Sequence, residues 1–341
     1  MTTTQPSDFS LLRTRQRRWL ITGVAGFIGS HVLEGLLKAG QCVTGLDDFS
    51  TGQESNLHRV RQQVGEEAWQ NFHLLRGDIR MPGDCRTACE DAEILLHHAA
   101  LVSVPLSIEK PALTHAINVE GFRTLLDACR NAGVRRVVYA SSSAVYGDNP
   151  TLPLSEAMTP RPQSPYAESK LTNERDALEF GLTHSIPTIG LRYFNVYGPG
   201  QNPQSAYASV MTAWVKAMRA GKAAVIYGDG HTTRDFCAVA DVVAANLLAA
   251  LTANPLALNR VYNIGTGLAT SLLTLHQALQ EVLGLEPTPP HHAPPRAGDI
   301  RHSVADITAA RALLGYAPSL ALRAGIEHML GTESYDFIHQ E

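Results

Sequence analysis

The stretch Trp19-Leu-Ile-Thr-Gly23-Val-Ala-Gly26-Phe-Ile-Gly29-Ser-His31 decides the fold of this chain. It predicts a buried strand, a glycine turn and the first turn of a helix, and the amphipathic run Phe27 to Lys38 continues that helix. Gly23 allows a sharp exit from the strand, Gly26 lets a pyrophosphate approach bare backbone N–H groups, and Gly29 lets the helix pack closely on the sheet. The stretch therefore predicts a dinucleotide-binding turn.

A second strand, Cys42 to Leu46, ends in Asp47, about 20 residues beyond the glycine turn. A carboxylate at this position hydrogen-bonds the adenosine ribose hydroxyls and would repel a 2′-phosphate. No arginine follows immediately to bind such a phosphate, so Asp47 predicts NAD rather than NADP. The alternative is that Asp47 and Asp48 only start a surface loop.

Composition and charge exclude several classes of protein. The chain has 341 residues, of which 44% are hydrophobic and 18% charged, and a net charge of −4 argues against nucleic-acid binding. The cluster Arg13, Arg15, Arg17, Arg18 is expected to be a solvated lead-in to the first strand. Five cysteines without a CxxC pair predict neither disulfides nor zinc, and we expect a cytoplasmic protein with no membrane span.

Strand and helix patterns alternate over the first two thirds of the chain. Further strands are predicted at 72–75, 94–97, 134–140 and 188–193, and helices at 84–90, 113–131 and 164–184. This order predicts an α/β fold with a doubly wound, Rossmann-like parallel sheet covered on both faces. Ligands of such sheets bind beyond the carboxyl ends of the strands.

The alternation breaks down after Tyr193 into Gly/Pro-rich connections, a helix near 206–220 and short strands around Val225 and Val261. A smaller second lobe is therefore expected. Residues 286–298 are predicted to be a loop because they are rich in proline. The pairs His97-His98 and His291-His292 have no third ligand at a suitable spacing, so no metal site is predicted.

Two groups of side chains can do chemistry at the predicted sheet edge. Tyr166 and Lys170 lie four apart on a helix, hence on one face. A lysine ammonium and an oxidised nicotinamide beside a phenol both favour the phenolate, and lowering its pKa by about three units corresponds to roughly 4 kcal/mol. Ser142 and Ser143 follow a strand and could share the proton with Tyr166; the alternative is that they are turn residues.

These motifs together resemble the extended short-chain dehydrogenase/reductase family. The likeness spans nearly the whole chain, and the segments that carry it are the glycine turn, Asp78-Ile79, Ala99-Ala100, Asn118, 141–147, Tyr166-xxx-Lys170 and Leu191-Arg-Tyr-Phe-Asn195. The resemblance implies that NAD contacts Gly23, Gly26, Phe27, Ile28, Gly29, Asp47, Asp78, Ile79, Ala99, Ala100, Asn118, Tyr166, Lys170 and Tyr193. It also implies a Rossmann domain of residues 1–193 plus about 236–264, and a UDP-sugar lobe of about 194–235 and 265–341.

The family's nucleotide-sugar enzymes differ in the residues beside the catalytic serine. Dehydratases carry Asp-Glu directly after it and decarboxylases a Glu, whereas this chain has Ser143-Ala144. Without these acids, the reaction that the resemblance leaves is oxidation and re-reduction at one carbon, which is epimerisation. The catalytic set implied is Tyr166, Lys170, Ser142 and Ser143, and the substrate set is Ser103, Ser142, Ser143, Tyr166, Asn195, Arg234, Arg296, Asp299 and Ser303.

Within the substrate set, Arg234 and Arg296 are expected to grip the diphosphate, since a guanidinium meets phosphate oxygens bidentately. Asp299 would hold the uridine ribose and Asn195 the diphosphate or sugar. Ser303 matches the position where narrow UDP-glucose/galactose epimerases carry a tyrosine, so it leaves room for a 2-acetamido group. Val102 departs from the galactose epimerases, which have a lysine there.

The resemblance thus favours bacterial UDP-N-acetylglucosamine 4-epimerases, which serve surface-polysaccharide pathways. Tyr166 would remove the 4′-hydroxyl proton while carbon 4 passes hydride to NAD. The ring of the resulting 4-keto sugar would then rotate, so that hydride returns to its opposite face. Alternatives are an epimerase of UDP-hexuronic acids, a dehydratase, decarboxylase or net dehydrogenase, and a non-catalytic NAD sensor. A homodimer paired through the helices at 113–131 and 164–184 is implied by resemblance alone.

Overall fold

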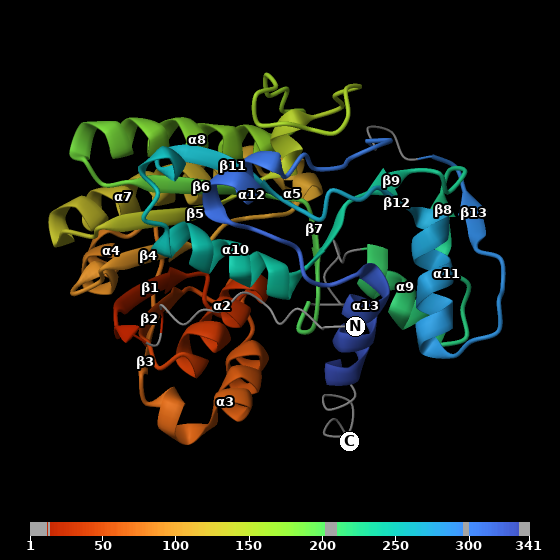
Figure 1. The fold of residues 1–341 in the computed structure, drawn as a ribbon, viewed down its shortest axis with the longest axis horizontal. Helices are drawn as coiled ribbons and strands as arrows, with labels where there is room; N and C mark the ends of the chain where they lie inside the picture. The colour runs from red at the N-terminus through yellow and green to blue at the C-terminus, as the bar shows by residue number, and fades with distance from the viewer. Residues whose placement is uncertain (1–11, 13, 202–209, 296–299, 334–341) are drawn as a thin grey trace.

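A seven-stranded parallel sheet forms the centre of the described chain (Figure 1). The computed structural model describes residues 12, 14–201, 210–295 and 300–333. The strand order is β11-β6-β5-β4-β1-β2-β3, and every neighbouring pair is parallel. The strands are β1 (Arg18–Thr22), β2 (Cys42–Asp47), β3 (Phe72–Arg76), β4 (Ile94–His97), β5 (Arg136–Ser142), β6 (Thr188–Tyr193) and β11 (Arg260–Ile264). The predicted Rossmann-like α/β class is confirmed.

Helices cover both faces of this sheet. One face carries α2 (Phe27–Lys38), with α3 (Glu54–Trp69) beside it, and α10 (Val239–Leu251), and the other carries α4 (Pro82–Cys89), α7 (Gly121–Ala132) and α8 (Pro165–His184) (Figure 1). Successive strand residues point to opposite cores: Ile21 packs in the α2 and α10 core, and Leu20 in the α7 and α8 core. Both faces are buried, which explains why the strands are apolar runs without alternation.

A second group of elements lies to one side of the sheet, at the right of Figure 1. It contains α9 (Val210–Arg219), α11 (Leu272–Leu283) and α13 (Leu322–Glu333). These helices form one hydrophobic core, to which they contribute Met211, Leu275 and Ile326 respectively. Its short strands are β8 (Val225–Tyr227), β9 (Thr233–Arg234), β12 (Thr270–Ser271) and β13 (His291–Ala293), while β7 (Asn195–Tyr197) and β10 (Phe236–Ala238) pair with each other. The remaining elements are α5 (Val104–Glu109), α6 (Pro111–His115), η2 (Ser143–Tyr146), η3 (Pro255–Ala257) and α12 (Thr308–Leu314).

Several predicted elements need correction. The single helix expected at 113–131 is instead α6, a π-helical turn at Ala116–Glu120, and α7. The strand expected at 134–140 is shifted two residues along the chain. The expected loop at 286–298 contains β13 in its described part, because His291 to Ala293 pair with β8. The helix α3 was not predicted.

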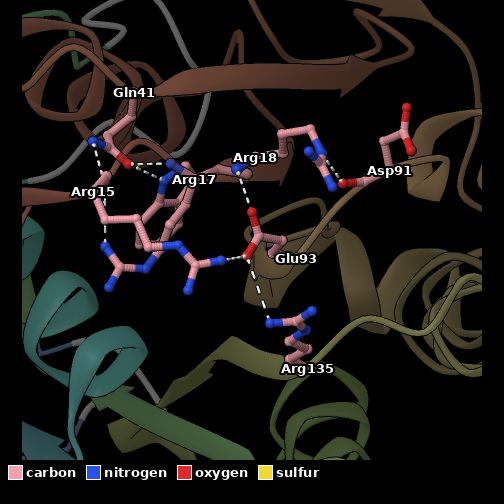
Figure 2. A network of polar contacts seen from close by, with 8 residues as sticks. Arg15, Arg17, Arg18, Gln41, Asp91, Glu93 and Arg135 are labelled. Atoms are coloured by element: carbon pink, nitrogen blue, oxygen red, sulfur yellow. Dashed lines mark hydrogen bonds and ion pairs between the residues drawn. The ribbon is translucent and has the colours of Figure 1, made fainter.

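Polar contacts fasten the start of β1 at the amino ends of the strands. Glu93 forms ion pairs with Arg15 at 2.7 Å and Arg135 at 4.0 Å and accepts a hydrogen bond from Arg18 N, and Arg18 Nε donates to Asp91 O at 2.6 Å (Figure 2). The Arg15 side chain is 56% exposed. Exposed pairs of this kind contribute about 0 to 1 kcal/mol each. Of the described arginines of the cluster, Arg15 and Arg18 are thus exposed, as expected, whereas Arg17 is half-buried, and Arg15 and Arg18 are also held by these contacts.

Candidate active site

The glycine turn before α2 is packed too closely for side chains. Gly23 has a φ of +69°, and its N–H donates to Leu46 O of β2 at 2.8 Å. A Cβ on Gly23 would lie 2.7 Å from Ala99 N, and one on Gly29 would lie 2.2 Å from Gly23 O. Real Cβ atoms essentially never make such short contacts. The approach of backbone segments therefore requires glycine at both positions.

The N-terminus of α2 presents backbone donors. Gly26 is the N-cap, its N–H donates to Gly23 O at 3.0 Å, no side chain in the described ranges caps the helix, and the first turn is without acidic residues. Phe27 packs edge-on against His31, and Ile28 is half-buried. A helix N-terminus of this kind binds anions through its N–H groups and its dipole. The turn therefore fits the pyrophosphate of a dinucleotide.

Asp47 lies at the end of β2, beside that turn. Its buried carboxylate accepts hydrogen bonds from Ala25 N at 2.8 Å and Phe49 N at 2.9 Å. Burial raises the pKa of the carboxyl, although the two hydrogen bonds counteract it. Each carboxylate oxygen can accept more than one bond, so ribose hydroxyls can bind to Asp47 as well.

The residues after β3, predicted to contact the adenine, have partners of their own. Asp78 forms an ion pair with Arg80 at 2.5 Å, which lowers the pKa of Asp78. Ile79 is buried against Gly121 at the start of α7. The backbone here is fixed because Asp78 N donates to Asp84 Oδ2 at 2.8 Å.

The segment after β4 passes directly over the glycine turn. Ala99 N donates to Thr22 Oγ1 at 3.4 Å and is followed by the half-buried Ala100. His98 stacks on Tyr193, with ring centroids 6.4 Å apart. The Tyr193 hydroxyl exchanges hydrogen bonds with Asn246 of α10, so it is held inside the fold.

Tyr166, Lys170 and Ser142 meet where β5 ends and α8 begins. The Lys170 Nζ lies 6.0 Å from the centroid of the Tyr166 ring and donates to Ala140 O of β5 at 2.9 Å. Ser142 ends β5 and shares a side-chain hydrogen bond with Tyr166, and Ser143 follows as the first residue of η2. The structure thus brings together the groups predicted for proton transfer.

The pKa shifts at this cluster differ from the expectation. Burial raises the pKa of Tyr166, and the hydrogen bond with Ser142 lowers it. Burial also lowers the pKa of Lys170 to about 8, opposed by the Glu174 carboxylate. In the protein without cofactor the pKa of Tyr166 is therefore raised rather than lowered, because loss of water around the phenolate dominates.

Asn118 lies in the π-helical turn at Ala116–Glu120. Its Oδ1 accepts from Leu101 N at 2.8 Å, and its Nδ2 donates to Leu101 O and to Ser169 Oγ, each at 3.0 Å. Ser169 in turn donates to Tyr166 O at 2.7 Å. The amide predicted as a cofactor contact therefore joins the loop after β4 to the helix of Tyr166. Single π turns of this kind are frequent at functional sites.

The second lobe brings Arg234 and Asn195 close together through Asp235. Asn195 N donates to Asp235 O at 2.9 Å, and Arg234 is half-buried with Nη1 donating to a backbone carbonyl. The Asp235 carboxylate, absent from the predicted set, is fully buried. Its donors are Thr266 N and Oγ1, Gly267 N and Ala305 N. The signal for it was a carboxylate that directly precedes the apolar run Phe236 to Ala240.

Ser303 and Ser103, also predicted to contact the substrate, lie outside the regular helices and strands. Ser303 is buried, and its N–H donates to Thr233 O of β9 at 3.2 Å. Ser103 caps α5 by accepting from Leu106 N at 3.1 Å, and the neighbouring Val102 is 64% exposed. Arg296 and Asp299 lie outside the described residues.

A buried ion pair next to the cluster was not predicted from the sequence. Glu174 lies one turn beyond Lys170 on α8 and pairs with Arg192 of β6 at 2.7 Å. The signal was the charge of Arg192 inside a fully buried strand, which requires a partner.

The described ranges hold neither a metal-ligand cluster nor a membrane-spanning helix. None of their His, Cys, Asp and Glu side chains form a group of three that could hold a metal ion. None of the helices found there is long and apolar enough to cross a bilayer.

Comparison with known proteins explains the arrangement. The model of the NAD dependent epimerase/dehydratase family matches residues 19–265. A UDP-glucose 4-epimerase of Mycolicibacterium smegmatis is 39% identical over 91% of this chain and 96% of its own. A UDP-N-acetylglucosamine 4-epimerase from Methanobrevibacter ruminantium, solved with UDP-N-acetylmuramic acid, is 32% identical with a TM-score of 0.87, covering 94% of this chain and 99% of that one.

A UDP-glucuronic acid 4-epimerase from Bacillus cereus, solved with NAD and a fluorinated UDP-glucuronic acid, is 30% identical with a TM-score of 0.83, and the match covers 95% of this chain and 99% of that one. The glycine turn, the carboxylate after β2 and the family match agree on NAD as the cofactor. The chain belongs to the NAD dependent epimerase/dehydratase family.

Proposed function

We propose that this chain is an NAD-dependent 4-epimerase of UDP-N-acetylhexosamines, with UDP-glucose and UDP-galactose as further substrates. The observation that carries the proposal is the meeting of Tyr166, Lys170 and Ser142 at the end of β5, followed by Ser143-Ala144 in place of acids. Without a carboxylate there, elimination or decarboxylation lacks its acid or base. The relatives named above are UDP-sugar 4-epimerases, which supports reversible oxidation at carbon 4.

Tyr166 would take the proton of the 4′-hydroxyl, and Ser142 would hydrogen-bond the same oxygen. Lys170, held by Ala140 O, would stabilise the phenolate. NAD, when bound along the glycine turn, supplies the acceptor and then the donor of the hydride at carbon 4. Tyr166 would then return its proton to the 4-keto oxygen, so the epimerisation leaves no net redox change.

The reaction requires the 4-keto sugar ring to rotate and present its opposite face to the cofactor while the nucleotide stays bound. We assign the anchoring to Arg234, Arg296 and Asp299, with Asn195 on the diphosphate side, and the nucleotide to the lobe of α9, α11 and α13. The buried Asp235 supports this role, because it fixes the backbone beside Arg234 through four hydrogen bonds. A weakly lined sugar pocket then leaves the ring free to rotate.

Preference for the acetamido sugar rests on Ser303. Its buried position beside β9 supports a small side chain there, and the exposed Val102 offers no cation to a sugar hydroxyl or carboxylate. The similarity to a UDP-N-acetylglucosamine epimerase supports this choice, while the similarity to a UDP-glucuronic acid epimerase keeps the 6-carboxylate sugars as its competitor.

The test is proton NMR of the purified protein, without added NAD, on UDP-N-acetylglucosamine, UDP-glucose and UDP-N-acetylglucosaminuronate in separate tubes. New anomeric and H4 signals of the galacto epimer, formed fastest from the neutral acetamido sugar, would support the proposal. Faster conversion of UDP-N-acetylglucosaminuronate would instead favour an epimerase of UDP-hexuronic acids. No conversion of any sugar, even with NAD added, would overturn it.

We also propose a homodimer paired through α7 and α8, on the family likeness alone. Light scattering coupled to gel filtration measures the mass directly, and a monomer at micromolar concentration would contradict the proposal.

A further inference from the structure

The buried ion pair beside Lys170 links three elements through one carboxylate. Arg192 Nε donates to Glu174 Oε1 at 2.8 Å and Arg192 Nη2 to Glu174 Oε2 at 2.7 Å, while Ser141 Oγ donates to Glu174 Oε1 at 2.5 Å. The side chains of Arg192 and Glu174 are 4% and 7% exposed. Glu174 on α8 thereby holds both the end of β5 and the end of β6.

The position of this carboxylate follows the catalytic residues along one helix face. Tyr166, Lys170 and Glu174 succeed one another at intervals of four residues, so their side chains share a face of α8. On the facing strand, Ser141 directly precedes Ser142. Any shift of β5 relative to α8 would therefore change the distance from Ser142 to Tyr166.

The network continues beyond the ion pair to β11 and to the segment after Ser303, which packs in the core of the main sheet. Arg192 Nη1 donates to the Tyr146 hydroxyl at 2.8 Å, and that hydroxyl donates to Asn263 Oδ1 at 2.6 Å. Asn263 Nδ2 donates to Leu154 O at 2.8 Å and to Asp306 O at 3.1 Å. The polar chain thus runs from the catalytic helix to the segment that follows Ser303.

Stability alone does not explain a buried pair of this kind. Removing two charges from water costs about as much as their attraction returns, and apolar replacements of similar volume are often neutral or stabilising. The placement between the catalytic helix and the catalytic strand suggests a role in the reaction instead.

We propose that Glu174 is a positioning residue of the epimerase site, which holds the end of β5 against α8 and whose negative charge stabilises the Lys170 ammonium. The inference rests on the proposed assignment of Tyr166 and Lys170. It predicts that Glu174 affects turnover without contacting the substrate.

The titratable groups around Lys170 define the pH dependence. Tyr166 and Glu174 face it from its own helix, His97 from the end of β4 and His98 from the residue after that strand. Burial and the lysine charge lower the pKa of both imidazoles. Tyr139 of β5 and Arg192 of β6 face Glu174. Since both imidazoles are neutral, Glu174 is the anionic group of this set that raises the pKa of Lys170.

The decisive experiment is the pH profile of kcat for Glu174→Gln, measured with saturating UDP-sugar. Lys170 acts as an ammonium, so losing the nearby charge should move the alkaline limb to lower pH. Suppose the pKa of Lys170 falls by one unit from about 8. The ratio of variant kcat to wild-type kcat is then about fivefold lower at pH 9 than at pH 7. The matched control is Glu168→Gln on the same helix, an exposed carboxylate 3.6 Å from Arg175, whose profile should not move.

An equal loss of kcat at every pH would overturn the charge role, because a merely structural change moves no limb. If Glu174→Gln does not fold, Ser141→Ala cuts the contact with β5 and leaves the ion pair intact. We expect kcat of Ser141→Ala to fall several-fold with KM and the limb unchanged, and an unchanged kcat would overturn the positioning role. Tyr166→Phe separates the two proposals: if that variant stays active, the site assignment fails first.

Discussion

Replacing Gly29 by alanine should damage the cofactor site more than the fold. The new Cβ would lie 2.2 Å from Gly23 O, 2.9 Å from Gly23 C and 3.0 Å from Val24 Cα, and all three atoms belong to the backbone of the phosphate turn. No side chain can rotate away to relieve these contacts. The first turn of α2 must therefore move away from β1.

The size of the effect follows from the shortest contact. To reach the 3.0 Å that real Cβ atoms rarely undercut, it must lengthen by about 0.8 Å, and overpacking of this kind costs about 1 to 3 kcal/mol. The same shift moves the N–H groups that would bind the pyrophosphate. Because 1.4 kcal/mol is tenfold in affinity, we expect the Kd for NAD to rise about 10- to 100-fold.

The assay is isothermal titration of cofactor-stripped protein with NAD, with thermal unfolding in parallel. Gly35→Ala in the same helix is the matched control, since its Cβ would meet only the Val243 Cγ1 side-chain atom at 3.3 Å and alanine favours the helix by about 1 kcal/mol. We expect Gly35→Ala to bind NAD normally. Wild-type affinity and Tm in Gly29→Ala would refute the packing argument.

Three other variants test the site. Tyr166→Phe should lower kcat at least about 10²-fold while UDP-sugar affinity, measured by titration, stays within a few-fold; near-normal turnover would rule out its role as base. Ser303→Tyr should lower kcat/KM for UDP-N-acetylglucosamine far more than for UDP-glucose in coupled assays, and equal losses would contradict the specificity argument. Lys170→Met should be inactive yet about 1 to 3 kcal/mol more stable at pH 7. The buried ammonium has its pKa lowered from 10.5 to about 8, so wild-type stability recovers as pH rises between those values and the difference should shrink. A constant difference in denaturant unfolding would contradict this account.

Strong periodic patterns predicted the fold well. The helix expected at Phe27 to Lys38 ends at the residue where α2 ends, because its apolar face stops there. By contrast, β13 has three residues and forms only by pairing with β8, far away in sequence. A polar helix such as α3, interrupted at Gly65 with a φ of +79°, gives no clear period.

The cluster of Tyr166, Lys170 and Ser142 could be predicted because a parallel sheet gathers the residues that follow its strands at one edge. The direction of the Tyr166 pKa could not, since it depends on how much water the fold removes. Glu174 was missed because a glutamate on a helix resembles a solvated surface residue until Arg192 is placed opposite it.

The π-helical turn at Ala116–Glu120 makes the length of this region a constraint on its evolution. Such a turn accommodates one residue more than an α-helix does, and each residue rotates a helix by about 100°. A single deletion there would restore a regular helix but swing Asn118 away from either Leu101 or Ser169. Related chains should therefore keep Asn118 and the number of residues between Pro111 and Ala132, while the exposed side chains of this range vary.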